Sequence, residues 1–270
     1  MNPTPRRRGA LAATGVVLAA LLAACAPSPA TSTASPATAA VTAPAGVARH
    51  LGPAGTPAKA FPKPRRQVAG IVAPTWGEGA HRDRSGEADT LFEAMRLAPG
   101  QAVADIGAGS GYHVIRLARR LGPQGTVYAQ DIMPDYLDML SRRLVAAGVP
   151  QGTGPGQVAL ALGEGHDPRL PPGSLDRVLM AHMYHEIEQP FGLLYNLAPA
   201  LRPGALVAVL EIDRDTARHG TPLDLLTCEF KAVGYRPAGV TRLEDKQRYV
   251  ALFEAPETPT PPAEIKACRP

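Results

Sequence analysis

The stretch "VADIGAGSGYHVIRLA", Val103–Ala118, decides the fold class of this 270-residue chain. An apolar run that closes on Asp105 predicts a buried strand, and three glycines then follow at every second position. From Tyr112 onward, apolar residues recur with helical spacing. Because glycine permits a tight turn and a close approach of a ligand to the backbone, the stretch predicts a strand–turn–helix unit that binds a nucleotide-like cofactor.

The spacing of Gly107, Gly109 and Gly111 disfavours a dinucleotide site. The dinucleotide fingerprint G-x-G-x-x-G needs its third glycine at position 112, which is Tyr112. A carboxylate at Asp105 would also repel a pyrophosphate, whereas it suits a ligand with an ammonium or sulfonium cation, or a water bonded to one. The sequence therefore disfavours an NAD-type reductase. A tight turn that binds nothing is the structural alternative.

Strand and helix signals alternate through the rest of the chain. The apolar spacing predicts helices at residues 87–97, 112–121, 134–147, 191–201 and 223–233. It predicts strands at residues 101–106, 126–131, 157–162, 174–181 and 205–212, with two closing strands near residue 240 and at 249–253. Such alternation indicates an α/β fold with a mainly parallel sheet covered by helices on both faces. The closing strands, which have no helix between them, add one antiparallel strand at the edge.

Four segments in order resemble the class I S-adenosylmethionine-dependent methyltransferases, and the resemblance extends through residues 68–255. "DIGAGSG" resembles motif I of that family, and Asp131 in "VYAQD" matches the acid that binds the ribose hydroxyls. In "ALGEGHDPRLPPGSLDRVLM", Glu164 takes the place of the acid near the adenine amine. "LRPGALVAVLE" is similar to the segment that enters the fifth strand.

The resemblance implies a Rossmann-like seven-stranded methyltransferase sheet, S-adenosyl-L-methionine as the cofactor, and a methyltransferase activity of class EC 2.1.1.-. The cofactor-binding residues that it implies are Asp105, Gly107, Ala108, Gly109, Ser110, Gly111, Tyr112, Asp131, Ile132, Glu164, Gly165 and His182. Two alternatives stay open. Asp131 can cap the helix that starts at Pro134, and His166 or Asp167 can take the place of Glu164.

The segment "HMYHEI" follows the fourth predicted strand, where acceptor and cofactor meet in the family. Methyl transfer requires positioning of the reactants and removal of a proton from the acceptor. The candidate catalytic residues are His182, Tyr184, His185 and Glu186. The order H-x-x-H-E matches neither of the zinc motifs H-E-x-x-H and H-x-x-E-H, and no third ligand is obvious, so we expect no metal. The alternative is that Tyr184 and His185 only pack against neighbouring residues. Trp76 and Tyr112 could form walls of the pocket, and for them too the alternative is packing alone.

The first 25 residues have the pattern of a secretory signal peptide. Arg6, Arg7 and Arg8 precede an apolar run that is too short to span a bilayer. The run ends in "LAAC", which resembles the lipobox of bacterial lipoproteins, whose cysteine, here Cys25, is lipidated. Paired arginines also occur in twin-arginine signals. We therefore expect an exported lipoprotein, anchored to a membrane only by lipid and facing the periplasm or the cell exterior.

Composition divides the remaining chain into three parts. Residues 26–66 are rich in Ala, Pro and Thr and predict a disordered linker, residues 67–255 the methyltransferase domain, and residues 256–270 a loose Pro-rich tail. Beyond residue 66 the chain has 20 basic against 24 acidic residues, which argues against a nucleic-acid partner. Cys228 and Cys268 could pair after export, but we expect a buried Cys228 and a free Cys268 because nothing in the tail fixes its position.

These observations predict a methyltransferase that acts on a small-molecule acceptor which the sequence does not identify. The alternative is an exported non-catalytic binding protein that keeps the methyltransferase fold. Export favours the alternative, because the cofactor is made in the cytoplasm, whereas the intact acid–glycine motif and Asp131 favour activity.

Overall fold

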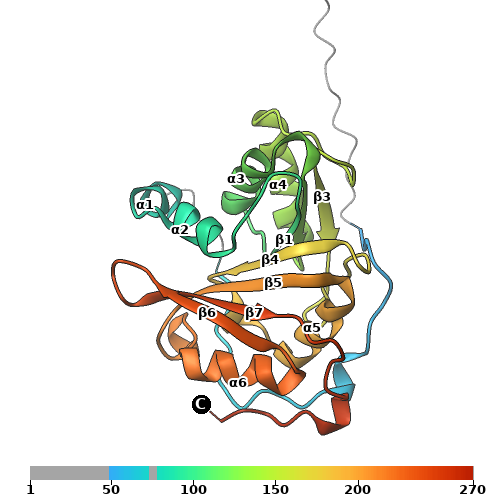
Figure 1. Ribbon diagram of the computed structural model, residues 1–270, viewed down its shortest axis with the longest axis vertical. Coiled ribbons are helices and arrows are strands. Elements are labelled where there is room, and N and C mark those ends of the chain that lie inside the picture. Colours follow the sequence, from blue (N-terminus) through green and yellow to red (C-terminus); the bar gives the residue numbers. More distant parts are fainter. Residues whose placement is uncertain (1–48, 73–77, 270) are drawn as a thin grey trace, which may run out of the picture. The chain divides into compact units, whose positions relative to one another are not determined.

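Strand β1 (Ala102–Ile106) lies inside a seven-stranded sheet of order β3-β2-β1-β4-β5-β7-β6 (Figure 1). The computed structural model describes residues 49–72 and 78–269, so the predicted signal peptide, Cys25 and Trp76 lie outside the described residues. The other strands are β2 (Thr126–Asp131), β3 (Gln157–Leu162), β4 (Leu175–Ala181), β5 (Leu201–Ile212), β6 (Arg236–Arg242) and β7 (Arg248–Glu254). Only β7 runs antiparallel to its neighbours, β5 and β6. This order confirms the predicted Rossmann-like methyltransferase sheet.

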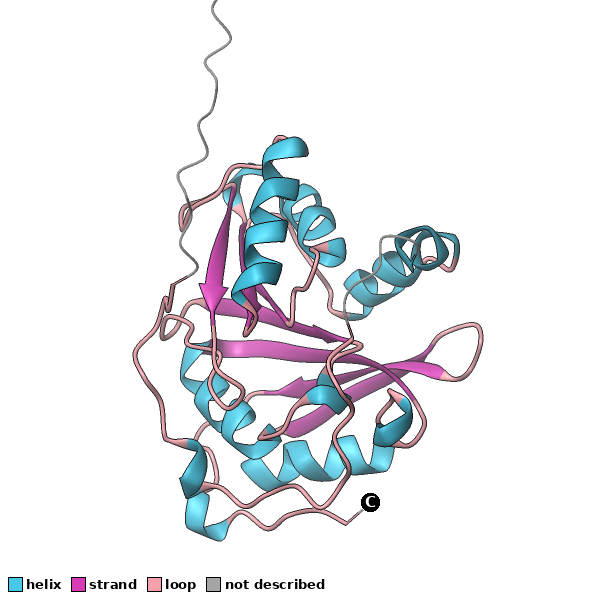
Figure 2. Cartoon of the chain, turned by 180° about the vertical axis from the view of Figure 1, so that it is seen from behind, coloured by secondary structure: helices cyan, strands magenta, loops and turns pink. Residues whose placement is uncertain are grey.

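Helices cover both faces of the sheet because central strands such as β1 and β2 are buried on both sides, whereas the edge strand β6 is exposed along its length. The helices are α1 (Glu78–Arg84), α2 (Glu87–Ala94), α3 (Tyr112–Leu121), α4 (Pro134–Ala146), α5 (Pro190–Leu197) and α6 (Leu223–Val233). On β1, Val103 packs in the cluster formed with α2, α3 and α4. Ala104 and Ile106 point the other way, into the cluster formed with α5 and α6. Figure 2 shows α5 and α6 from behind, on the face opposite α3 and α4.

Strands β1 and β4 are parallel neighbours at the centre of the sheet, and the chain leaves β1 on one side and β4 on the other. Their carboxyl ends, Ile106 and Ala181, therefore open at the switch point where ligands bind in parallel sheets. Among the described residues, no helix combines the length and the apolar character needed to cross a bilayer.

The predicted linker is ordered over its last part, because residues 49–66 lie along the domain. Arg49 forms a β-bridge with Ala161, and the Thr56 N–H donates to Asn196. Phe61 is buried in the cluster beneath α5, and Arg66 is buried as well. The polar composition gave no signal for this strap, since its contacts are mostly backbone hydrogen bonds. The prediction of a linker up to residue 66 is therefore wrong for residues 49–66.

The tail is ordered too, and the expectation of a buried Cys228 and a free Cys268 is wrong, because Cys228 is exposed and Cys268 is buried and paired. Cys228 on α6 and Cys268 form a disulfide across 40 residues of sequence. Ile265 is buried in the same cluster as α6, and the Thr260 N–H donates to the carbonyl of Val233. These contacts bring the tail to the cysteine on α6. The sequence did not reveal them because a single buried isoleucine leaves no periodic signal.

Candidate functional site

The glycine turn after β1 adopts backbone angles that favour glycine. Gly107, Gly109 and Gly111 have φ values of 71°, 50° and 82°. A Cβ on Gly107 would lie 2.9 Å from Cγ of Met183, and one on Gly111 would lie 2.2 Å from Cδ1 of Leu140. The turn therefore fits closely between the segment after β4 and helix α4, and α3 begins directly after it.

Asp131, at the end of β2, connects the glycine turn to the start of α4. One carboxylate oxygen accepts from the Gly109 N–H and the other from the Met133 N–H, both at 2.9 Å. The helix N-cap is Met133 and has no side-chain cap, so the alternative of Asp131 as the cap does not hold. Burial raises the pKa of Asp131, while the backbone N–H groups oppose that shift. Each oxygen keeps a lone pair for a ligand.

Asp105 is a buried carboxyl that makes no side-chain hydrogen bond to any described residue. It is 3% exposed, and burial raises its pKa to about 8 although Arg82 opposes the shift. A buried carboxyl without a partner is costly unless a ligand supplies one. A cation in the cavity would stabilise its charged form.

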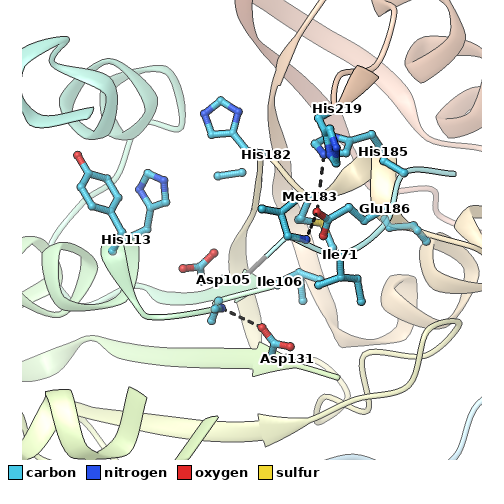
Figure 3. A pocket seen from close by; sticks show the side chains of 18 of the residues that line it. Ile71, Asp105, Ile106, His113, Asp131, His182, Met183, His185, Glu186 and His219 are labelled. Carbon is cyan, nitrogen blue, oxygen red and sulfur yellow. Dashed lines mark hydrogen bonds and ion pairs between the residues drawn. The ribbon is translucent and has the colours of Figure 1, made fainter. Parts of the chain in front are cut away.

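One large cavity of about 1460 Å³ lies at the carboxyl ends of the strands (Figure 3). It brings together most of the residues singled out in the sequence. The predicted cofactor residues that line it are Asp105, Gly107, Ala108, Gly109, Ser110, Tyr112, Asp131, Ile132, Glu164, Gly165 and His182. The predicted catalytic residues that line it are His182, His185 and Glu186.

Two predicted site residues lie outside the cavity lining. Gly111 is buried against Leu140. Tyr184 is fully buried and packs on Phe230, so it belongs to the core, as the packing alternative proposed. Glu164 does line the cavity, but its carboxylate is half-exposed and lies 3.6 Å from Arg169.

His182 is held by a buried acid that the sequence did not indicate. Its Nε2 lies 3.0 Å from Glu87, which begins α2 and also pairs with Arg248 at 2.7 Å. Burial alone would raise the pKa of Glu87, but the hydrogen bond and charge of His182 and the charge of Arg82 lower it to about 2. Glu87 is therefore a fixed negative charge that orients the His182 ring at the cavity wall. Acidic residues are common in the first turn of a helix, so the position of Glu87 at the start of α2 did not single it out.

His185 is oriented in the same way by Glu211, at the end of β5. The Nδ1 atom of His185 lies 2.9 Å from Glu211 Oε1, and both side chains are buried. Nε2 of the ring lies 3.9 Å from the carboxylate of Glu186. Burial raises the pKa of Glu186, which accepts from the Val72 N–H. The sequence predicts a strand that contains Glu211 but not its pairing with His185, because the two residues are 26 positions apart.

Arg66 supports the turn that carries these residues, η3 (Tyr184–Glu186). Its guanidinium donates to the carbonyls of Tyr184, His185 and Ile187 and pairs with Glu229 at 3.1 Å. All of these groups are buried, which makes such a charged network sensitive to the loss of one member. Sequence reasoning placed Arg66 in the linker, so its role as a brace was missed.

The central part of the chain is similar to known proteins. Residues 103–204 match a family model described as "Methyltransferase domain". The chain is 30% identical over 90 residues to the protein-L-isoaspartate O-methyltransferase of Ignicoccus hospitalis. This match covers 33% of this chain and 40% of that protein. It is 27% identical over 163 residues to the ubiquinone/menaquinone biosynthesis C-methyltransferase UbiE of Ectopseudomonas mendocina, 59% of this chain and 60% of that protein. The chain spans about half the length of the curated relatives it matches.

Solved structures share the fold. A SAM-dependent methyltransferase from Aquifex aeolicus superposes with a TM-score of 0.57 at 20% identity, covering 64% of this chain and 91% of that one. The [4+2]-cyclase SpnF superposes with a TM-score of 0.56 at 13% identity, covering 74% and 90%. At these identities the likeness concerns the fold alone, and the second example is named for a reaction other than methyl transfer.

Proposed function

We propose that this chain, which contains a class I S-adenosylmethionine-dependent methyltransferase domain, transfers a methyl group to a small-molecule acceptor. The observation that carries the proposal is the buried Asp105 carboxyl, which lacks a hydrogen bond to any described residue and faces the cavity beside the glycine turn. The family model covers the residues that form this part of the cavity, from β1 to the start of β5.

The residues present fit S-adenosyl-L-methionine, the cofactor of that family. Asp105 would hold its cationic amino-acid end, directly or through water, and the free lone pairs of Asp131 would accept from two hydroxyls. The narrow turn around Gly107 and Gly109 leaves backbone exposed to the cavity rather than side chains. When bound, the cofactor supplies a methyl group on a positively charged sulfur.

The wall of the cavity formed by the segment after β4 suits an acceptor that must lose a proton. His182 lies on this wall with its Nε2 directed to Glu87, so the ring can take up a proton at its other nitrogen. Carboxylate–histidine pairs of this kind fix the ring orientation and stabilise the charged imidazolium. The exposed apolar side chains of Ile71 and Val72 at the rim favour an acceptor with an apolar part.

Calorimetry of the full chain with S-adenosylmethionine, S-adenosylhomocysteine and NAD tests the cofactor. We expect binding of the first two only. Asp131→Ala should weaken it by about 1.5–3 kcal/mol, as expected for a lost hydrogen bond to a charged group. Gly109→Val should abolish it, whereas Asp138→Ala, an exposed acid on α4, serves as the matched control. Equal affinity in all three variants would refute the site.

We also propose that the protein is exported as a lipoprotein. The lipobox at Cys25 supports this, and so does the Cys228–Cys268 disulfide, because disulfides persist in oxidising compartments. Cys25→Ser should release the protein from membranes in cell fractionation. Wild-type protein that stays soluble with residues 1–24 attached would contradict export.

The export route bears on the second candidate function, a binding protein that no longer catalyses. An unfolded chain cannot carry a cofactor through a membrane, whereas the twin-arginine route moves folded proteins. Replacing Arg7 and Arg8 by Lys keeps the positive charge but should stop processing at Cys25 if that route is used. Normal processing, together with no methyl transfer by the purified protein, would favour the binding protein.

A further inference from the structure

Three metal-ligating side chains meet on the acceptor wall of the cavity: His185, Glu186 and His219. Each offers one ligand atom, and these atoms all lie within 4.8 Å of one another (Figure 3). The first two belong to the turn after β4, and His219 follows the short helix η5 (Thr216–Arg218) after β5. The topology places β4 and β5 side by side, so their carboxyl ends bring together residues 33 positions apart in the sequence.

The His185 ring has the orientation of a metal ligand. Its Nδ1 is engaged by Glu211 at 2.9 Å, and this leaves Nε2 directed toward Glu186 at 3.9 Å. Metal-ligating histidines almost always pass their other ring N–H to a carboxylate or carbonyl, which fixes the tautomer. Glu211 is fully buried, so loss of its contact with His185 would leave a buried carboxylate without that partner, which is costly.

His219 is held at its backbone but not at its ring. Its φ is 57°, and Arg214 donates from two nitrogens to its carbonyl, at 3.3 and 3.1 Å. The ring meets that of His185 edge-on with 5.4 Å between centroids. The His219 side chain is partly exposed beside the other two residues, so it would be the third ligand of an ion that they hold.

We infer that His185, Glu186 and His219 bind a divalent transition metal, with Zn²⁺ as the occupant that fits best. Two imidazoles and one carboxylate are the ligand set of catalytic zinc sites that keep a fourth position open, whereas Mg²⁺ and Ca²⁺ prefer oxygen alone. With bonds of about 2.1 Å, tetrahedral ligand atoms lie about 3.4 Å apart. The three ligand atoms, which lie within 4.8 Å of one another, would therefore draw closer together around the ion.

The fourth position would face the cavity, because all three ligands line it. An acceptor oxygen, nitrogen or sulfur bound there would be held and would lose its proton more readily. This role of the metal rests on the proposed methyl transfer, whereas metal binding itself does not. His185 and Glu186 would then be ligands rather than bases. The His182–Glu87 pair would remain as the proton acceptor. The expectation of no metal rested on the lack of a third ligand nearby, and His219 supplies it from another strand end.

Zinc titration of the chelator-treated full chain tests the site. Calorimetry with zinc chloride gives the affinity, and elemental analysis after equilibrium dialysis gives the stoichiometry. We expect one zinc per chain. His219→Ala and Glu186→Gln should lower the affinity by at least about 10–100-fold, the loss already seen when outer-shell partners are removed. His50→Ala is the matched control, because this exposed histidine lies outside the cavity lining.

Two outcomes would overturn the inference. Zinc well below one equivalent in the wild-type chain would show that the cluster does not bind it, and an equal loss in His50→Ala would place zinc elsewhere. Binding of S-adenosylmethionine is measured on the same samples without metal. Cofactor binding by the wild-type chain tests the proposed function, and cofactor binding by each variant shows whether that variant is still folded. A failure of zinc binding can therefore be told apart from a failure of the proposed function.

Discussion

The two sides of the cavity are built in different ways. The cofactor side, formed by residues 105–112 and Asp131, comes from two consecutive strand ends and the turn between β1 and α3. The acceptor side, formed by residues 182–186 with Glu87, Glu211 and His219, draws its partners from α2, β5 and the region after β5. The first is a local motif supported by backbone geometry. The second depends on side-chain pairs between distant segments, so the two sides should respond differently to substitution.

The largest effect is expected where the cofactor side is packed most tightly. Gly111→Ala would place a Cβ 2.2 Å from Leu140 at a φ of 82°. The left-handed backbone and the overpacking together should lower the free energy of unfolding by about 2–5 kcal/mol. Gly148→Ala is the control for backbone strain alone, because its φ is 66° and no atom lies within 4 Å of its added Cβ.

Urea unfolding of both variants measures the difference. A loss in Gly148→Ala as large as that in Gly111→Ala would mean that packing against α4 contributes nothing. The rigidity of the cofactor side would then come from its backbone conformation only.

A second large effect should fall on the acceptor side. The Cys228–Cys268 disulfide closes a loop of 40 residues, and reduction should cost about 3–4 kcal/mol of stability. Cys228 precedes Glu229, whose pairing with Arg66 supports the η3 turn. Reduction should therefore weaken zinc binding, while affinity for S-adenosylmethionine stays within about twofold in protein that is still folded. Chemical unfolding with and without dithiothreitol, followed by the two titrations, checks this, and a parallel loss of cofactor affinity would remove the distinction.

The same contrast explains what the sequence could predict. The bounds of α3, β2, β3 and α6 follow from periodicity and turn residues, because those signals are local. The turn of residues 107–111 was visible for the same reason. Helix α1 was not predicted, nor were the partners Glu87, Glu211 and Arg66. Their roles arise from contacts across at least 26 residues, which no periodic pattern encodes.

The strap and the tail teach the same lesson from composition. Residues 49–66 and 256–269 are rich in Pro and Ala, which is typical of disorder, yet each contributes one buried apolar residue to the core, Phe61 and Ile265. Backbone hydrogen bonds, the buried Arg66–Glu229 ion pair and one disulfide hold the remainder. Low hydrophobicity predicts that a segment does not fold by itself. It does not predict whether the segment is ordered by contacts with the surface of the folded domain.

A moderate effect is expected from the titration of Asp105. Burial raises its pKa from 3.8 to about 8, so the Asp105 carboxyl is mostly protonated at neutral pH, while a cationic ligand requires the charged form. The ratio of wild-type to Asp105→Asn affinity for S-adenosylmethionine should rise about tenfold per pH unit up to about pH 8 and then level off. Taking the ratio cancels titration of the ligand itself.

Stability should change in the opposite direction. The folded state holds the proton of Asp105 at pH values where the unfolded state has lost it, so wild-type stability relative to Asp105→Asn should fall between about pH 4 and pH 8. Thermal unfolding across this range measures it. A constant difference between the two proteins would show that Asp105 titrates normally.

The smallest effect tests whether α1 belongs to the cofactor side. Tyr112 begins α3, and its hydroxyl donates to Asp83 of α1 at 2.9 Å. Arg116 lies 3.9 Å over the Tyr112 ring and also pairs with Asp83, so Tyr112→Phe removes one donor and leaves the ring contact and the ion pair. Because these groups are exposed, the loss of stability should be at most about 0.5–1 kcal/mol. Affinity for S-adenosylmethionine should change by less than about threefold, because the cofactor contacts are local to the glycine turn and Asp131. Tyr112→Leu, which also removes the ring beneath Arg116, serves as the comparison variant. A tenfold loss in Tyr112→Phe alone would mean that the hydroxyl holds α1 over the cofactor, and the cofactor side would then depend on a distant segment as the acceptor side does.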